Sequence, residues 1–243
     1  MNRYKASAYH FIGSAAVLFL VFAWVRWVWY PDIFFTAANG LNLLSIIVPV
    51  DVIIGPLITL IIFNPLKQAA LKRDMAIIFV AQIVFLLYGI FTIYQARPVY
   101  VALVEKDFYL VTANEIDPQD QQKAKDPNFQ KLPLLGPRWI NTYVSDAKVR
   151  DDLAFSNAFA RLGPQNMPEY YKAYSTALPT IKAVALPPNK IVELHADRRE
   201  TLQKYVDQKK NENKAVAFIR LYAKTKIFYV AVNINTGAVL DFL

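Results

Sequence analysis

The sequence has no cysteine and only two histidines, His10 and His195, among its 243 residues. The lack of cysteine excludes a disulfide framework, a thiol nucleophile and a thiolate metal site, and two histidines leave little material for a metal cluster. Glycine is scarce too: its seven residues form neither a phosphate-binding loop nor a Gly-x-Ser-x-Gly turn. We therefore expect no metal, no cofactor and no catalytic residue. The alternative of an enzyme whose catalytic residues follow none of these motifs stays open.

Charged side chains are rare in the first part of the chain. Residues 1–95 carry six basic and three acidic side chains, whereas the remainder carries 21 and 16. The whole chain is 55% hydrophobic with a mean hydropathy of +0.24, which argues against a disordered chain and against an ordinary soluble enzyme. The change in composition predicts two regions, residues 1–95 and residues 96–243.

Three apolar runs fill the first region, at residues 11–30, 41–63 and 75–94. A helix needs about 20 residues to cross the ~30 Å hydrocarbon layer, and each run reaches that length. We predict three transmembrane helices in contact with the lipid bilayer, because core helices this apolar would need a much larger soluble protein to cover them. A cleavable signal peptide that ends near Ala37 and Ala38 is the competing interpretation of the first run, but that run is unusually long and rich in tryptophan.

Basic residues mark one side of the predicted membrane. They precede the first run and separate the second from the third, whereas residues 31–40 have none: Arg3, Lys5, Lys67, Lys72 and Arg73. The excess of such residues in cytoplasmic loops predicts a cytoplasmic N-terminus. Three spans then place residues 96–243 outside the cytoplasm, in the periplasm of a Gram-negative cell. The tryptophans near the end of the first run and Tyr30 suit the outer headgroup layer.

Arg26 and Asp51 are the only charged residues within the runs. An unpaired ion in mid-bilayer costs at least ~2.5 to 3.5 kcal/mol, so both need compensation. Side chains lean toward the N-terminus of their helix, and a long Arg26 side chain could reach inward to Asp51. The alternatives are an Arg26 that extends to lipid phosphates and a protonated Asp51 bonded to a neighbouring helix. A proton relay or a small oligomeric transporter that uses Asp51 is a further alternative function.

Small and polar residues share one face of the second run. Asp51, Gly55 and Thr59 recur every four residues, and Gln82 and Gly89 form a comparable stripe on the third run. Such stripes permit close approach of helices in membranes. We expect these two stripes to face each other, or to face a helix of another protein.

Several short motifs resemble those of the type IV pilin accessory protein family, TfpX/TfpZ type. They follow one another in order through roughly the first half of the chain: Trp29-Tyr30-Pro31, Gly40, the run from Asp51 through Gly55-Pro56 and Thr59 to Phe63, Pro65, Lys67, Asp74, Gln82, Tyr88-Gly89, Arg97-Pro98-Val99-Tyr100, Asp107-Phe108 and Ala113-Asn114-Glu115.

This resemblance implies an inner-membrane protein that assists the stability or assembly of type IV pilin, or pilus dynamics, and it transfers no catalytic residue. We expect the protein to act by direct binding to the major pilin, as a pilin-specific chaperone or assembly modulator. We expect no nucleic-acid partner, and self-association stays open. Arg97 and Pro98 mark the exit from the membrane, and the intramembrane candidates for packing or partner contact are Arg26, Asp51, Gly55, Thr59, Gln82 and Gly89.

The sequence pattern of residues 96–243 predicts a periplasmic α+β domain with an antiparallel sheet. β-branched and aromatic residues mark strands at residues 98–104, 108–113, 215–223, 227–233 and 238–242. Residues 115–135 have the composition of a long loop, and their aspartates lack the spacing of a calcium loop. Two helices are predicted at residues 145–161 and 196–211, the first with an apolar stripe that should pack on the sheet.

Overall fold

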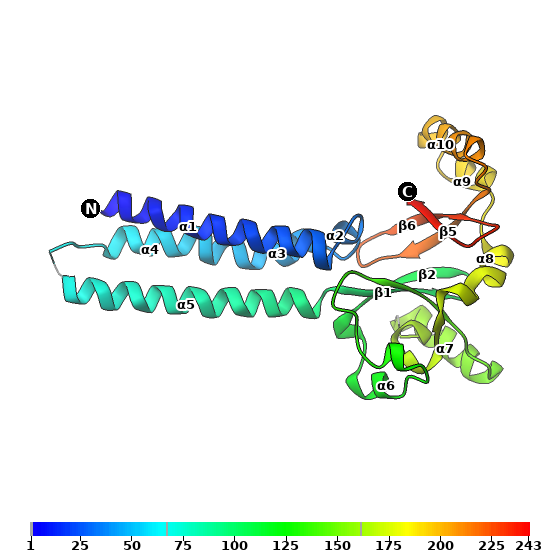
Figure 1. Ribbon diagram of the computed structural model, residues 1–243, viewed down its shortest axis with the longest axis horizontal. Coiled ribbons are helices and arrows are strands. Elements are labelled where there is room, and N and C mark those ends of the chain that lie inside the picture. The colour runs from blue at the N-terminus through cyan, green and yellow to red at the C-terminus, as the bar shows by residue number, and fades with distance from the viewer. Residues whose placement is uncertain (1, 67, 161) are drawn as a thin grey trace. The chain divides into compact units, whose positions relative to one another are not determined.

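The computed structural model describes residues 2–66, 68–160 and 162–243. Within these residues the chain forms two compact units, Met1–Arg97 and Pro98–Leu243. The first unit is helical, and the second combines a sheet with short helices (Figure 1). Lys67 and Arg161, which entered the sequence predictions, lie outside the described residues.

The first unit contains three long apolar helices that lie side by side (Figure 1). Its elements are α1 (Arg3–Trp24) with its continuation η1 (Val25–Trp29), α2 (Phe34–Ala37), α3 (Gly40–Val48), η2 (Pro49–Ile54), α4 (Gly55–Ile62) and α5 (Gln68–Gln95). Three segments of 27, 23 and 27 residues are long and apolar enough to cross a membrane, which confirms the three predicted apolar helices. The first begins at Arg3, eight residues before the apolar run, and Asn2 caps it by accepting the Lys5 N–H.

Two of these helices contain π-helical segments, η1 and η2. Pro49 and Pro56 stand at the start of η2 and just beyond its end, and neither has a backbone N–H for the usual helical bond. The wider π turn therefore replaces part of the regular pattern of helical hydrogen bonds, and Asp51 within it is buried. The sequence pattern of period four did not predict this change of helix type.

Aromatic residues fasten the helices at the end where α5 stops. The buried Tyr30 hydroxyl donates to the Ile93 carbonyl at 2.9 Å, and the Trp29 and Tyr94 rings lie 5.3 Å apart. Arg97 is also buried, with its guanidinium over the Tyr94 ring and a hydrogen bond to the Tyr94 carbonyl. The last turn of α5 is thus held from both sides by ring contacts and backbone acceptors.

The second unit is built on a seven-stranded mixed sheet in the order β4-β3-β1-β2-β5-β6-β7. Its strands are β1 (Pro98–Val104), β2 (Asp107–Thr112), β3 (Arg138–Thr142), β4 (Tyr171–Ala173), β5 (Val216–Tyr222), β6 (Ile227–Asn233) and β7 (Val239–Phe242). The prediction of an antiparallel sheet is therefore wrong in two places, because β1 pairs with β3, and β2 with β5, in parallel. The five predicted strands are present, whereas the short strands β3 and β4 were missed.

Two hydrophobic cores stabilise the two halves of this sheet. One gathers around β1 and β3 and includes Val99, Tyr100, Ala102, Ile140 and Tyr171. The other joins the helices near the C-terminus to β5 and β6 and includes Ile191, Leu202, Val216, Phe218 and Ala231. Each half thus buries its own apolar side chains.

The helices of this unit are α6 (Pro118–Gln122), α7 (Ala147–Ala160), α8 (Leu178–Val184), α9 (Pro188–Leu194) and α10 (Arg199–Asn211). The two predicted helices correspond to α7 and α10. The expectation that the apolar stripe of α7 packs on the sheet is wrong, because Phe155 and Phe159 are largely exposed and no residue of α7 is buried among those described. The two rings instead contact each other, with centroids 4.6 Å apart.

Strands β2 and β5 join the two halves of the sheet through only two paired positions, Phe108 with Leu221 and Tyr109 with Tyr222. A bidentate ion pair supports this short parallel ladder. Arg220 donates to both carboxylate oxygens of the buried Asp107, at 2.8 and 2.9 Å. Hydrogen bonds to this carboxylate raise the pKa of Arg220 and keep the guanidinium charged.

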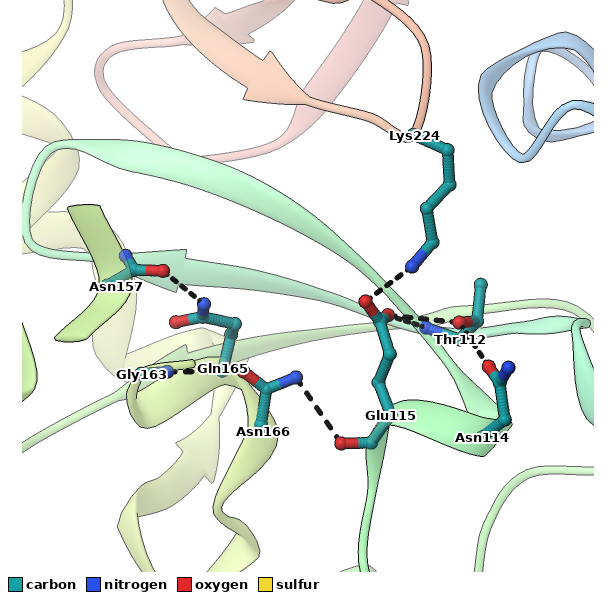
Figure 2. Close-up of polar contacts among 8 residues, drawn as sticks. All are labelled: Thr112, Asn114, Glu115, Asn157, Gly163, Gln165, Asn166 and Lys224. Atoms are coloured by element: carbon teal, nitrogen blue, oxygen red, sulfur yellow. Dashed lines mark hydrogen bonds and ion pairs between the residues drawn. The ribbon is translucent and has the colours of Figure 1, made fainter. Parts of the chain in front are cut away.

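A second ion pair supports the other end of the same junction, where Lys224 contacts Glu115 (Figure 2). Glu115 also accepts the Thr112 N–H at 2.8 Å and the Thr112 hydroxyl at 2.9 Å, which closes a capping box after β2. Asn166 donates to the Glu115 carbonyl, and its own side-chain oxygen accepts the Gly163 N–H. This network ties the end of β2 to the turn after β5 and to the segment that follows α7.

We expect Arg220→Gln to destabilise the junction more than Asp107→Asn. Loss of the guanidinium leaves a carboxylate that is 6% exposed without a counter-charge, whereas Arg220 is 36% exposed and stays hydrated without Asp107. Arg220→Gln, which leaves the buried carboxylate unpaired, should cost about 3 kcal/mol, and Asp107→Asn, which leaves the exposed guanidinium unpaired, about 1 kcal/mol. Amide hydrogen exchange of β2 and β5 in the full chain measures both costs. Equal effects of the two substitutions would contradict the asymmetry.

Candidate functional site

A polar cluster lies inside the helical unit and joins all three long helices. His10 of α1 is its centre: Nδ1 lies 2.7 Å from the Thr59 hydroxyl of α4, and Nε2 lies 2.7 Å from Gln82 Oε1 of α5. Ser7, one turn earlier on α1, donates to the Pro56 carbonyl at 2.9 Å. Buried polar groups are costly unless they are bonded, so these contacts fix how the three helices pack.

Gly55 allows the second and third helices to approach closely. A Cβ at this position would collide with the Gln82 amide and would lie 2.8 Å from its Cδ. The amide uses this space to donate from Nε2 to the Asp51 carbonyl at 3.2 Å. The predicted stripes therefore meet where Gly55 and Thr59 face Gln82, and buried Gly89 lies about two turns further along α5.

The hydrogen bonds restrict the protonation of His10. Gln82 donates from Nε2 to a carbonyl, so its Oε1 faces His10 and requires a proton on the histidine Nε2. At Nδ1 there are two solutions, because the Thr59 hydroxyl either donates to the ring or donates to the Gly55 carbonyl, 3.1 Å away. If Thr59 donates to the ring, Nδ1 carries no proton and His10 is neutral. If Thr59 donates to the Gly55 carbonyl, Nδ1 carries a proton as well and His10 is a cation. The cluster accommodates both without the loss of a His10 hydrogen bond.

Asp51 is the exception in this cluster. The residue is 5% exposed, and among the described residues neither carboxylate oxygen has a hydrogen-bond partner. Its side chain lines a cavity of about 410 Å³ together with His10, Gln82 and apolar residues of α1 and α5. The arrangement therefore leaves an unpaired, buried hydrogen-bond acceptor beside this cavity.

The structure does not bring Arg26 to Asp51. Arg26 lies in η1, where Nη1 donates to the Tyr30 carbonyl at 3.4 Å and the guanidinium lies 6.0 Å from the centre of the Phe35 ring. Arg97 and Pro98, the predicted membrane exit, stand at the end of the helical unit and at the first residue of β1. Within the described parts of the chain, no three His, Asp or Glu side chains converge as metal ligands would.

His10 and Ser7 are the site residues that sequence reasoning missed. Both precede the apolar run that begins at residue 11, although α1 already begins at Arg3. A usable signal was present, because Ser7, His10 and Ser14 lie three and four residues apart and so share one face of a helix. Extension of the first helix toward its polar start would have placed His10 inside the span.

Comparison with known proteins assigns the family. Three fimbrial assembly proteins of Dichelobacter nodosus are similar to this chain. The serogroup I protein is 26% identical over 248 residues and the serogroup E1 protein 25% over 247, each covering 98% of this chain and 95% of the relative. The protein of serogroups C1 and C2 is 33% identical over 115 residues, which are 46% of this chain and 86% of that relative. The chain belongs to the fimbrial assembly protein family.

No protein-family model and no solved structure matches this fimbrial assembly family member. The family is shown by the relative that is 33% identical, of which the chain covers 86%, and the other two relatives extend through both units. The relatives support a role in pilus assembly, and the site described above is the half-buried polar cluster that connects the three helices.

For this fimbrial assembly protein, we expect Gly55→Ala to destabilise the helical unit and Gly13→Ala to leave it unchanged. The new methyl group at position 55 displaces the Gln82 amide from His10 and from the Asp51 carbonyl, at a cost of about 1 kcal/mol. A Cβ at Gly13 meets no described atom within 4 Å. Thermal unfolding in detergent measures the difference. Equal melting temperatures for the two variants would show that the close approach at Gly55 is not needed.

Proposed function

We propose that this protein is an inner-membrane assembly factor of type IV pili that binds the major pilin. The observation that carries the proposal is the similarity to two fimbrial assembly proteins over 98% of the chain. The resemblance of the motifs around Asp51, Gln82 and Arg97 to type IV pilin accessory proteins of the TfpX/TfpZ type supports the finer assignment.

The proposed role is non-catalytic. The polar side chains of the cluster are used to join helices: His10, Thr59 and Gln82 bond one another or nearby carbonyl groups. Binding to a folded pilin subunit would stabilise it by mass action until it enters the pilus. Such a factor acts as a pilin-specific chaperone or assembly modulator.

In the proposed topology, α1, the α3–α4 span and α5 cross the membrane, with the N-terminus in the cytoplasm and Pro98–Leu243 in the periplasm. Basic residues at the start of α1 and of α5 support this direction, as do the tryptophans at the opposite end of the first helix. The exposed apolar side chains of the three helices support contact with lipid tails.

A topology reporter tests this orientation. Alkaline phosphatase fused after Leu243 should be active, because this enzyme folds in the periplasm, whereas a fusion after Asn64, between the second and third helices, should be inactive. The reverse pattern would overturn the topology. Equal expression of the two fusions, checked by immunoblot, is the control.

Deletion and cross-linking test the proposed partner. Loss of the protein should lower the abundance of the pilin encoded in the same strain several-fold, because unbound subunits are exposed to proteolysis. A tagged full-length protein, cross-linked in intact membranes, should recover that pilin, and an unrelated three-span protein tagged in the same way should not. Unchanged pilin abundance together with no recovered pilin would contradict the proposal. Proton- or solute-dependent flux in vesicles would instead favour the relay or transporter.

A further inference from the structure

The first and third helices leave a groove between them. Both helices pack against the middle span, and the cavity of about 410 Å³ is lined by Gly13, Ser14 and Val17 of α1 and by Phe79, Ile83 and Leu86 of α5. A side chain at Gly13 would meet open space. Small residues on one wall and apolar residues on the other are typical of surfaces where transmembrane helices pack closely.

The middle span contributes a charged group, Asp51, to this largely apolar groove. Asp51 lines the cavity, is 5% exposed and has no hydrogen-bond partner among the described residues. Two other polar residues that line the cavity, His10 and Gln82, already have hydrogen-bond partners. Gln82 bonds His10 and the Asp51 carbonyl, and His10 bonds Thr59. An unsatisfied carboxylate in an apolar environment is costly, and a donor from outside would remove that cost.

We infer that the groove receives an apolar transmembrane helix of the pilin, and that this helix places one hydrogen-bond-donating group, cationic or neutral, against the Asp51 carboxylate. The inference rests on the proposed function and assigns the surface at which the subunit binds. A lipid acyl chain fits the apolar walls but offers no donor to Asp51. Arg26, the cation within the apolar runs, contacts Tyr30 and Phe35 instead.

The recognition has two separable parts. The shape of the groove depends on the absence of a side chain at Gly13, and its polarity depends on Asp51. A helix packed against Gly13 and Ser14 brings its backbone close to α1, which places a donor within reach of the carboxylate. Each part can be altered without changing the His10 hydrogen bonds.

A photo-cross-linking amino acid placed at Val17 tests the surface in the full-length protein, in membranes that contain the cognate pilin. Val17 lines the groove and is 46% exposed, whereas Val80 of α5 is 59% exposed and does not line it, so a cross-linker at Val80 is the matched control. We expect the pilin to be cross-linked from Val17 and not from Val80. Cross-links that join two copies of this chain, or only lipid, would overturn the inference.

Two substitutions then separate shape from polarity. Gly13→Leu fills the groove and should lower the yield of the Val17 cross-link about tenfold, while Val84→Leu on the exposed face of α5 should leave it unchanged. Asp51→Asn keeps the shape and removes the charge, and it should lower the yield about five- to tenfold, because the amide oxygen still accepts a hydrogen bond but lacks the charge that strengthens it. Protein levels and melting temperatures of all variants are measured in the same membranes.

The outcomes distinguish the inference from the proposed function. If full-length protein still recovers the pilin but the Val17 yield is insensitive to both Gly13→Leu and Asp51→Asn, the groove is wrong and pilin binding stands. If no variant and no wild-type protein recovers the pilin, the proposed function itself fails. Should Asp51→Asn prove unstable, the result for Gly13→Leu decides, because no described atom opposes a side chain there.

Discussion

The helical unit depends on one constraint: a polar group buried among apolar helices must find its hydrogen bonds within the protein. His10 meets this constraint by reaching both other helices, through Thr59 and through Gln82. Apolar side chains alone give weak preference for one depth or rotation of a helix, since lipid tails are as apolar as the helices. Two hydrogen bonds from the His10 ring fix both the depth and the rotation of the helix. The Gln82 bond also requires glycine at position 55, because the Gln82 amide occupies the space that a side chain would fill there.

The same constraint makes Asp51 informative. Its backbone carbonyl is used by Gln82, yet its carboxylate has no partner among the described residues. Asp51 lies in the π-helical segment between Pro49 and Pro56, on the face that Gly55 and Thr59 continue, and all three residues are buried. Unsatisfied buried groups are rare in native proteins, and each one calls for an explanation. The proposed contact with a partner helix rests on the unpaired carboxylate of Asp51.

In the second unit, side chains compensate for a short backbone ladder. Strands β2 and β5 share two paired positions, and an ion pair stands at each end of the junction, Asp107 with Arg220 and Glu115 with Lys224. Each half of the sheet has its own core, and the junction has the fewest paired backbone positions of all neighbouring strands in the sheet. The exposed Phe155 and Phe159 belong to α7, on the chain between β3 and β4.

Local patterns predicted what local forces determine. Alternation and β-branched residues located strand β6 to the residue, and apolar length located the three long helices. The parallel pairings could not be predicted in this way, because β1 meets β3 and β2 meets β5 only after long connections. The polar cluster shows the same limit: Gly55, Thr59 and Gln82 were visible as stripes, but their partner His10 lies 49 and 72 residues away from Thr59 and Gln82. Only the packed helices bring these groups together, so the chemistry of the site is a property of the fold.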